Sequence, residues 1–430
     1  MKKLVLIMMI ICLLPINSYG QIKEFMLENG LKVIIIEDNK APVVTFQIWY
    51  KVGARNESAF PNGISHMLEH MMFKGTKQYG PNVLSSTVSR NGGVDNAFTT
   101  KDYTVYFQTL PADRINISLD FESDRMRNLL LNNKEIDSEK QVVIEERRLR
   151  TEDNPQSLLF EEVNAAAFKA HPYHNPVIGW MSSIEAINIF DLDFYYHTYY
   201  SPDNAFIIVV GDVDSDILMP SIKKSFQNIS STMRKTKTPP KEPEQNGERR
   251  LILKKKAELP FILMAFHVPS VPNEDSYALE VMVGVLEGKS GRFYKDIIEQ
   301  GSAINAFVSY DSLSPDPYLL HIGGSVGQGK DIRMLEAAFD KEIKRLQSEL
   351  ISPNDIQKVI NQIEAAFIKE QDSTFSLGYT TGEFEILGDY KLKDTYLDSI
   401  KKVTPNDVKR VAIKYLTDEN KTVGVLVPIK

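Results

Sequence analysis

His66 and His70 are the residues of this sequence whose type and spacing most directly indicate chemistry. On a helix, residues four apart lie one turn apart on the same face, so both imidazoles can reach one metal ion. Glu69 shares that face and can contact a water molecule on the metal without being a ligand itself. The alternative is a pair of surface histidines on an amphipathic helix. The chain has only 7 histidines in 430 residues, which makes a chance match of this spacing rare.

A third ligand is offered by a second predicted helix, residues 138–149. Ser138 and Gln141 match a capping box at its start. Glu139 and Glu146 are seven residues apart, which is two helical turns, so they project from one face. A run of two glutamates and two arginines is also typical of a solvated helix face, and Glu145 is interpreted in that way. For Glu139 and Glu146, the residues alone leave both interpretations open.

Residues 66–70 form the inverted zinc-peptidase motif, in which the glutamate precedes the second histidine. With the spaced glutamate downstream, the sequence resembles the pitrilysin/insulinase family of zinc peptidases. It is most similar to the short bacterial relatives of the mitochondrial processing peptidase beta subunit. The likeness extends over nearly the whole mature chain and follows the family's order in five stretches: residues 63–75, 92–100, 138–149, 172–180 and 199–213.

The resemblance implies that His66, His70 and Glu146 hold one zinc ion per chain and that Glu69 is the catalytic base. Glu139 then corresponds to the family's additional acid, which supports catalysis from behind the ligands. Two imidazoles and one carboxylate leave a fourth position open, as catalytic zinc requires. Such an ion activates water and polarises the scissile carbonyl, while the base carries the proton to the departing amine. The ligand set also tolerates manganese or cobalt.

Residues 94–108 predict where the substrate lies. Tyr103 and Phe107 alternate with polar positions, as in a half-buried strand. The resemblance places Asn96, Ala97 and Phe98 in an edge strand to which the substrate adds as a further strand. Main-chain pairing of that kind accepts any extended peptide. For Asn96, a purely structural role in the turn that enters the strand is the alternative.

The first residues indicate export. A basic start, an apolar run over residues 4–16 and small residues at Ser18 and Gly20 match a secretory signal peptide of residues 1–20. The apolar run is too short for a stable membrane span. Cys12, the only cysteine, lies inside this segment, so the mature chain has no disulfide framework. We therefore expect a periplasmic or secreted protein.

Composition excludes little beyond nucleic-acid binding. The net charge is −7 and no basic stripe stands out. About 410 residues remain after the signal peptide, enough for two domains with their own cores.

Two similar α+β domains are predicted, each a mostly antiparallel sheet with helices on one face. A polar, proline-punctuated linker at residues 233–250 separates a catalytic zinc-binding domain (21–232) from a homologous non-catalytic domain (251–430). Tyr199 and Asn204 recur as Tyr415 and Asn420, both offset by 216 residues, each time between a capped helix and a buried strand. This repeat suggests duplication. The second half carries no metal motif.

A phosphate-binding loop is the main competing motif. Residues 324–330 have its glycine and lysine spacing, but Asp331 stands where the loop needs Ser or Thr to hold magnesium. An aspartate there also repels phosphate, so nucleotide binding is disfavoured.

The predicted function is zinc-dependent hydrolysis of short or unfolded peptides, with peptides as the partners and no nucleic acid. In the family, chains of this length work as homodimers or heterodimers, and an arginine and a tyrosine from a non-catalytic half grip the substrate. Ile297 and Ile304 stand where that pair would fall. A homologous second chain is therefore expected to complete the site. The alternatives are a catalytic subunit that is inactive alone, or a peptide-binding assembly subunit.

Overall fold

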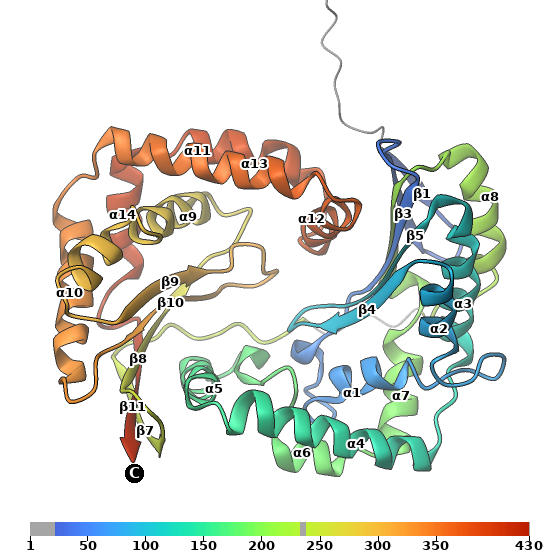
Figure 1. The fold of residues 1–430 in the computed structure, drawn as a ribbon, viewed down its shortest axis with the longest axis horizontal. Coiled ribbons are helices and arrows are strands. Elements are labelled where there is room, and N and C mark those ends of the chain that lie inside the picture. The colour runs from blue at the N-terminus through green and yellow to red at the C-terminus, as the bar shows by residue number, and fades with distance from the viewer. Residues whose placement is uncertain (1–21, 233–237, 430) are drawn as a thin grey trace, which may run out of the picture.

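The computed structural model describes residues 22–232 and 238–429. The expected signal peptide, Cys12 and residues 233–237 of the predicted linker lie outside this part. Two β-sheets face each other across the molecule, each backed by helices (Figure 1). This arrangement confirms the predicted α+β architecture.

The first sheet has the strand order β1-β2-β6-β3-β5-β4, and every pair except β2 with β6 is antiparallel. β4 is therefore an edge strand, as expected. The apolar stretches of β3 and β6 are buried along almost their whole length, which puts them in the middle of the sheet. The strands are β1 (Ile22–Met26), β2 (Lys32–Glu37), β3 (Val43–Tyr50), β4 (Val94–Thr99), β5 (Thr104–Pro111) and β6 (Ala205–Gly211).

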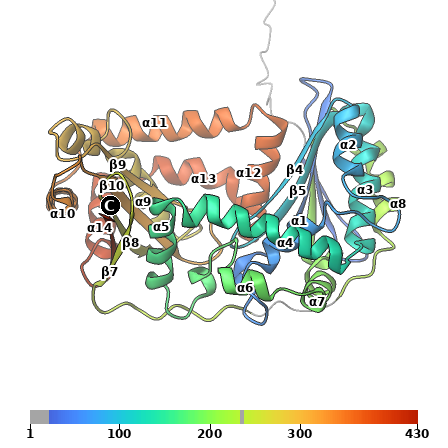
Figure 2. The same ribbon diagram turned by 60° about the horizontal axis from the view of Figure 1, so that its bottom comes forward.

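Eight helices belong to the described part of the first half. Helices α2, α3 and α8 contribute to the hydrophobic core on the outer face of the first sheet (Figure 2). Helices α4 and α5 follow one another from this sheet toward the second (Figure 2). The helices are α1 (Ile64–Met71), α2 (Val83–Arg90), α3 (Ile115–Asn128), α4 (Asn133–Arg147), α5 (Pro155–Ala167), α6 (Met181–Ala186), α7 (Ile189–Tyr199) and α8 (Ser215–Phe226).

The second sheet has the order β7-β11-β8-β10-β9, in which only β7 and β11 run parallel. Its strands are β7 (Arg249–Lys256), β8 (Phe261–Val268), β9 (Asn305–Tyr310), β10 (Tyr318–Ser325) and β11 (Lys421–Ile429). The helices of this half are α9 (Glu274–Leu286), α10 (Ile332–Ser348), α11 (Pro353–Glu370), α12 (Thr374–Ile386), α13 (Leu392–Lys401) and α14 (Pro405–Tyr415). Within the described ranges, no helix combines the length and apolar character that a membrane span needs.

The predicted repeat is confirmed in detail. The helix–strand unit α7–β6 recurs as α14–β11 after a shift of 216 residues: both helix boundaries and the first strand residue coincide, and β11 runs on to Ile429. Nδ2 of Asn204 donates to the carbonyl of Tyr199 at 2.9 Å, and Nδ2 of Asn420 donates to that of Tyr415 at 2.8 Å. Each asparagine closes the helix end before the strand begins.

Each half also lends a helix to the sheet of the other half. α5 packs on β8 and β11, and α12 packs on β3 and β6. Glycines permit this close approach: a side chain on Gly382 of α12 would clash with the indole of Trp49, and one on Gly424 of β11 would clash with Val163 of α5. The exchange joins residues of both halves in one hydrophobic core.

Candidate metal centre

The start of α1 is shaped by residues outside the motif. Gly63 caps the helix with φ of 91°, a left-handed conformation that favours glycine. The carboxylate of Glu57, fully buried, accepts the backbone N–H groups of Gly63 at 2.8 Å and Ser65 at 2.9 Å. These bonds satisfy donors that the first turn of a helix leaves unpaired. They fix the turn from which His66 and His70 project.

α4 lies against α1 and carries the two expected acids. The helix begins at Asn133, not at Ser138, so the predicted capping box is wrong. Asn132 is the cap, because it is extended and its side chain accepts the N–H of Glu135 at 3.0 Å. Ser138 therefore lies inside the helix, and Glu146 lies in the last turn.

Three of the expected residues converge. One ligand atom from each of His66, His70 and Glu146 can be chosen so that all lie within 4.8 Å of one another. Oε2 of Glu146 is 3.4 Å from Nε2 of His70 and 3.8 Å from Nε2 of His66. Zinc–ligand bonds of about 2.0–2.2 Å at tetrahedral angles separate ligand atoms by roughly 3.3–3.5 Å. The donor set and its spacing therefore fit a zinc ion with small adjustments.

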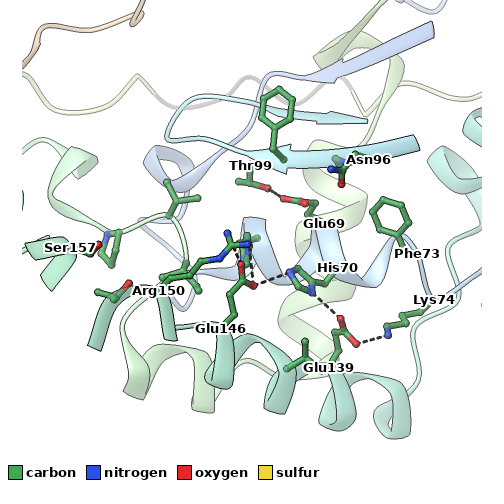
Figure 3. Close-up of a pocket in the computed structure, with 18 of the residues that line it drawn as sticks. Glu69, His70, Phe73, Lys74, Asn96, Thr99, Glu139, Glu146, Arg150 and Ser157 are labelled. Atoms are coloured by element: carbon green, nitrogen blue, oxygen red, sulfur yellow. Dashed lines mark hydrogen bonds and ion pairs between the residues drawn. The ribbon is translucent and has the colours of Figure 1, made fainter. Parts of the chain in front are cut away.

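The two histidines differ in their support from behind. Nδ1 of His70 lies 2.8 Å from Oε1 of Glu139, and Lys74 pairs with the other oxygen of that carboxylate (Figure 3). Burial opposes protonation of His70, but hydrogen bonds with Glu139 and Glu146 outweigh it and raise its pKa to about 9. Burial and the neighbouring His70 lower the pKa of His66 to about 4. Nδ1 of His66 is buried and meets no hydrogen-bond partner among the described residues.

Glu69 lies beside the convergent triad but does not join it. Its side chain is mostly buried, with 9% exposed, and burial raises its pKa. Thr99 Oγ1 donates to Oε2 of Glu69 at 2.5 Å, and this hydrogen bond partly offsets the effect of burial by lowering the pKa of Glu69. A partly desolvated carboxylate with a raised pKa is suited to take and return a proton near neutral pH.

Sequence reasoning missed several residues at this site, namely Thr99, Lys74 and Arg150. Nη1 of Arg150 lies 2.9 Å from Oε1 of Glu146, the oxygen that faces away from the histidines. Arg150 belongs to a π-helical turn, Arg148–Glu152, which directly follows α4. The E-E-R-R run was a signal for local ion pairs: Glu145 pairs with Arg148 at i,i+3, and Glu146 pairs with Arg150 at i,i+4.

A cavity of about 1040 Å³ opens over these residues, lined by parts of α1, β4, α4, α5 and the loop before α6. Asn96, Ala97 and Phe98 line it together with the metal-site residues. Oδ1 of Asn96 accepts the N–H of Ala97 at 2.9 Å. Ile297 is buried in the core of the second half and Ile304 is 56% exposed, and in the described part of the chain neither lines this cavity.

In the competing phosphate-loop motif, Asp331 has a structural role. Asp331 caps α10 and accepts the N–H of Arg333 at 3.0 Å. Its carboxylate therefore takes the helix terminus at which a phosphate would bind. This contact supports the expectation that residues 324–330 do not bind nucleotides.

Comparison with known proteins agrees with the resemblance. A family model described as insulinase, peptidase family M16, matches residues 32–180, and one described as the peptidase M16 inactive domain matches residues 186–363. The zinc protease PqqE of Helicobacter pylori is 32% identical over 413 residues, covering 94% of this chain and 92% of the relative. A probable mitochondrial-processing peptidase subunit beta of Arabidopsis thaliana is 26% identical over 416 residues, covering 94% and 78%.

Solved structures agree as well. A crystal structure of a protease from Helicobacter pylori superposes with a TM-score of 0.91 at 30% identity, covering 95% of this chain and all of that chain. The periplasmic protease PqqL from Escherichia coli shares the fold, with a TM-score of 0.77 at 18% identity over 95% of this chain and 48% of that one. The chain belongs to the insulinase family of peptidases, family M16.

Proposed function

We propose that this protein is a zinc-dependent endopeptidase that cleaves short or unfolded peptides. The observation that carries the proposal is the convergence of His66, His70 and Glu146 beside the buried Glu69, inside a cavity bordered by an edge strand. The zinc proteases among its relatives support the choice of metal.

His66, His70 and Glu146 would hold the ion. When bound, zinc supplies a Lewis acid that makes water easier to deprotonate and polarises the scissile carbonyl. Glu69 acts as the general base: it accepts the proton of the attacking water and delivers it to the leaving amine. Glu139 holds His70 through Nδ1, which directs Nε2 toward the ligand cluster.

The substrate would add to β4 as a further strand. β4 pairs with β5 on one side only, so its other edge can pair with an extended peptide. Asn96, Ala97 and Phe98 would contact the peptide main chain next to Glu69. Recognition through the backbone would allow cleavage of many unfolded sequences, since it places few demands on side chains.

The test is Glu69→Gln, which keeps the shape of the side chain and removes the base. We expect zinc content to stay at one ion per chain while peptide cleavage falls by about 100- to 10,000-fold. Loss of metal from this variant would make Glu69 a ligand instead. Undiminished cleavage would remove it from the mechanism.

A second chain completes the active enzyme in this proposal. Ile297 and Ile304 cannot supply the polar grip that the resemblance expects, and two relatives are named as beta subunits of a processing peptidase. Full activity then requires a homologous chain without the metal motif. If the purified chain cleaves peptides at full rate alone, with no gain from any homologous chain of the same organism, this part of the proposal fails.

Export is a further part of the proposal, and it rests on residues 1–20. The mature chain would begin at Gln21 in the periplasm or the medium. N-terminal sequencing of the protein from fractionated cells tests it, and an intact Met1 in the cytoplasmic fraction would contradict it.

A further inference from the structure

The edge strand β4 presents two faces with different neighbours. Residues alternate along a strand, so Asp95, Ala97 and Thr99 point to one face. Ser85 of α2 donates to Asp95 at 2.5 Å, and Ala97 packs in the core that contains α1. Phe98 points to the other face, toward Tyr379 of α12. The strand's alternation therefore places Thr99 on the side of the metal-site helix.

Thr99 connects this strand to Glu69 directly. Its hydroxyl donates to Oε2 of Glu69 at 2.5 Å, a bond that joins the end of β4 to the last turn of α1 (Figure 3). Thr104 Oγ1 lies 3.5 Å from the Thr99 hydroxyl and itself donates to the carbonyl of Val52 at 2.9 Å. Thr104 is fully buried and begins β5. The hydroxyl that holds Glu69 thus sits in a fixed corner of the sheet.

A glutamate side chain has three rotatable bonds, and its catalytic use requires one orientation. A hydroxyl bound to Oε2 restrains the carboxylate and leaves the other oxygen for proton transfer. Because the hydroxyl comes from the strand that would also hold the peptide, one element sets both the base and the scissile bond. A shift of β4 would then displace the base and the scissile bond together.

We propose that Thr99 is a positioning residue that fixes the carboxylate of Glu69 relative to the substrate-binding edge strand. The proposal rests on the peptidase function proposed above. It assigns Thr99 no contact with the reacting atoms, only an action through Glu69.

Two variants separate this role from simple packing. Thr99→Val keeps the shape of the side chain and removes the hydroxyl, whereas Thr99→Ser keeps the hydroxyl. A hydrogen bond to a charged group is worth enough to predict that Thr99→Val lowers kcat roughly 10- to 100-fold. KM and zinc content should change less than about twofold, because neither the strand edge nor the ligands are altered. Thr99→Ser should keep kcat within about threefold of the wild type.

Thr87→Val is the matched control, since Thr87 lies on α2 and its hydroxyl contacts only surface groups of the same helix in the described structure. This variant should behave like the wild type. Equal kcat in Thr99→Val and the wild type would overturn the proposal. So would an equal loss in Thr99→Val and Thr99→Ser, because that result indicates packing and not the hydroxyl.

A crystal structure of zinc-loaded Thr99→Val gives a readout that does not depend on turnover. We expect the Glu69 side chain to leave the single orientation that it has in the wild type. An unchanged, well-ordered Glu69 would contradict the proposal. If the wild type binds zinc but cleaves no peptide under any condition, the peptidase proposal fails, whereas the orientation of Glu69 in the variant still decides the role of Thr99.

Discussion

Individual side chains behind the metal-site residues determine how well the site can hold an ion. Lys74 pairs with Glu139, and Glu139 in turn engages Nδ1 of His70. Burial would raise the pKa of Glu139, but the hydrogen bonds from His70 and Lys74 lower it. Lys74 therefore keeps Glu139 ionised and able to accept from His70. His66 has no such support among the described residues. The contacts among Lys74, Glu139 and His70 therefore do most to orient the metal-binding side chains.

Lys74→Met should weaken zinc binding roughly 10-fold, because loss of a partner behind a ligand typically lowers metal affinity 10- to 100-fold. Competition with a chromogenic chelator measures the affinity. Lys77→Met is the control, since Lys77 is exposed three residues further along the chain. Equal affinity in the two variants would show that Lys74 does not act through Glu139.

At the same scale, sequence reasoning could locate residues that depend on local spacing. The i,i+4 histidines needed only helical periodicity, and the structure brings them to within reach of Glu146; their role as ligands stays a prediction. Thr99 could not be found in this way, because its contact with Glu69 depends on how β4 packs against α1. Arg150 lies four residues after Glu146, the spacing of a helical ion pair, so local spacing could have indicated that contact.

The type of each helix or strand could be predicted from the sequence more readily than the element against which it packs. The repeat of α7–β6 as α14–β11 followed from matching residues at one offset. The start of α4 was predicted too late in the chain, because the apparent capping box at Ser138 matched a helix start while the true cap is Asn132. The exchange of α5 and α12 was not predicted, since an apolar helix face does not reveal which sheet will cover it.

Gly382 tests how closely α12 docks on the first sheet. Glycine-to-alanine changes inside a helix normally stabilise by up to about 1 kcal/mol. Here we expect Gly382→Ala to destabilise by about 1–3 kcal/mol, because the new methyl group meets the indole of Trp49. Gly80→Ala is the control, because its methyl group would lie 3.8 Å from Val83, an ordinary van der Waals contact. Urea unfolding compares them, and equal stability of the two variants would contradict this packing.

Glu383 makes the docking of α12 sensitive to pH. Burial raises its pKa to about 7, assisted by repulsion from Asp311 and opposed by a hydrogen bond from Tyr379. A raised carboxyl pKa adds stability that is complete below the ordinary value of about 4.5 and is lost as pH rises through 7. Between pH 5 and 8 the wild type should therefore lose about 1–3 kcal/mol more than Glu383→Gln, given 1.36 kcal/mol per pKa unit. Metal-free protein is used for both unfolding series. An identical pH dependence in the two proteins would show that Glu383 does not titrate in this range.

At the scale of the whole molecule, the exchanged helices α5 and α12 hold the two halves together by packing, in addition to the covalent linker. Trp49, Phe206 and Ile208 of the first sheet share a core with residues of the second half. Ion pairs add to this contact, with Lys32 Nζ 2.8 Å from Glu385 and Arg55 Nη1 2.9 Å from Asp316. The covalent connection should therefore be dispensable once the chain has folded.

A protease site placed at residues 233–237 tests this expectation. After cleavage, the halves should elute together on gel filtration at the volume of the intact chain, because separation would expose the apolar faces covered by α5 and α12. Denaturation and refolding should return less of the paired form, since each sheet would have to find its helix on another chain. A protein with the same site left uncut is the control. Two separate, folded peaks under native conditions would show that each half buries its own core, and that the exchanged helices contribute little to holding the molecule together.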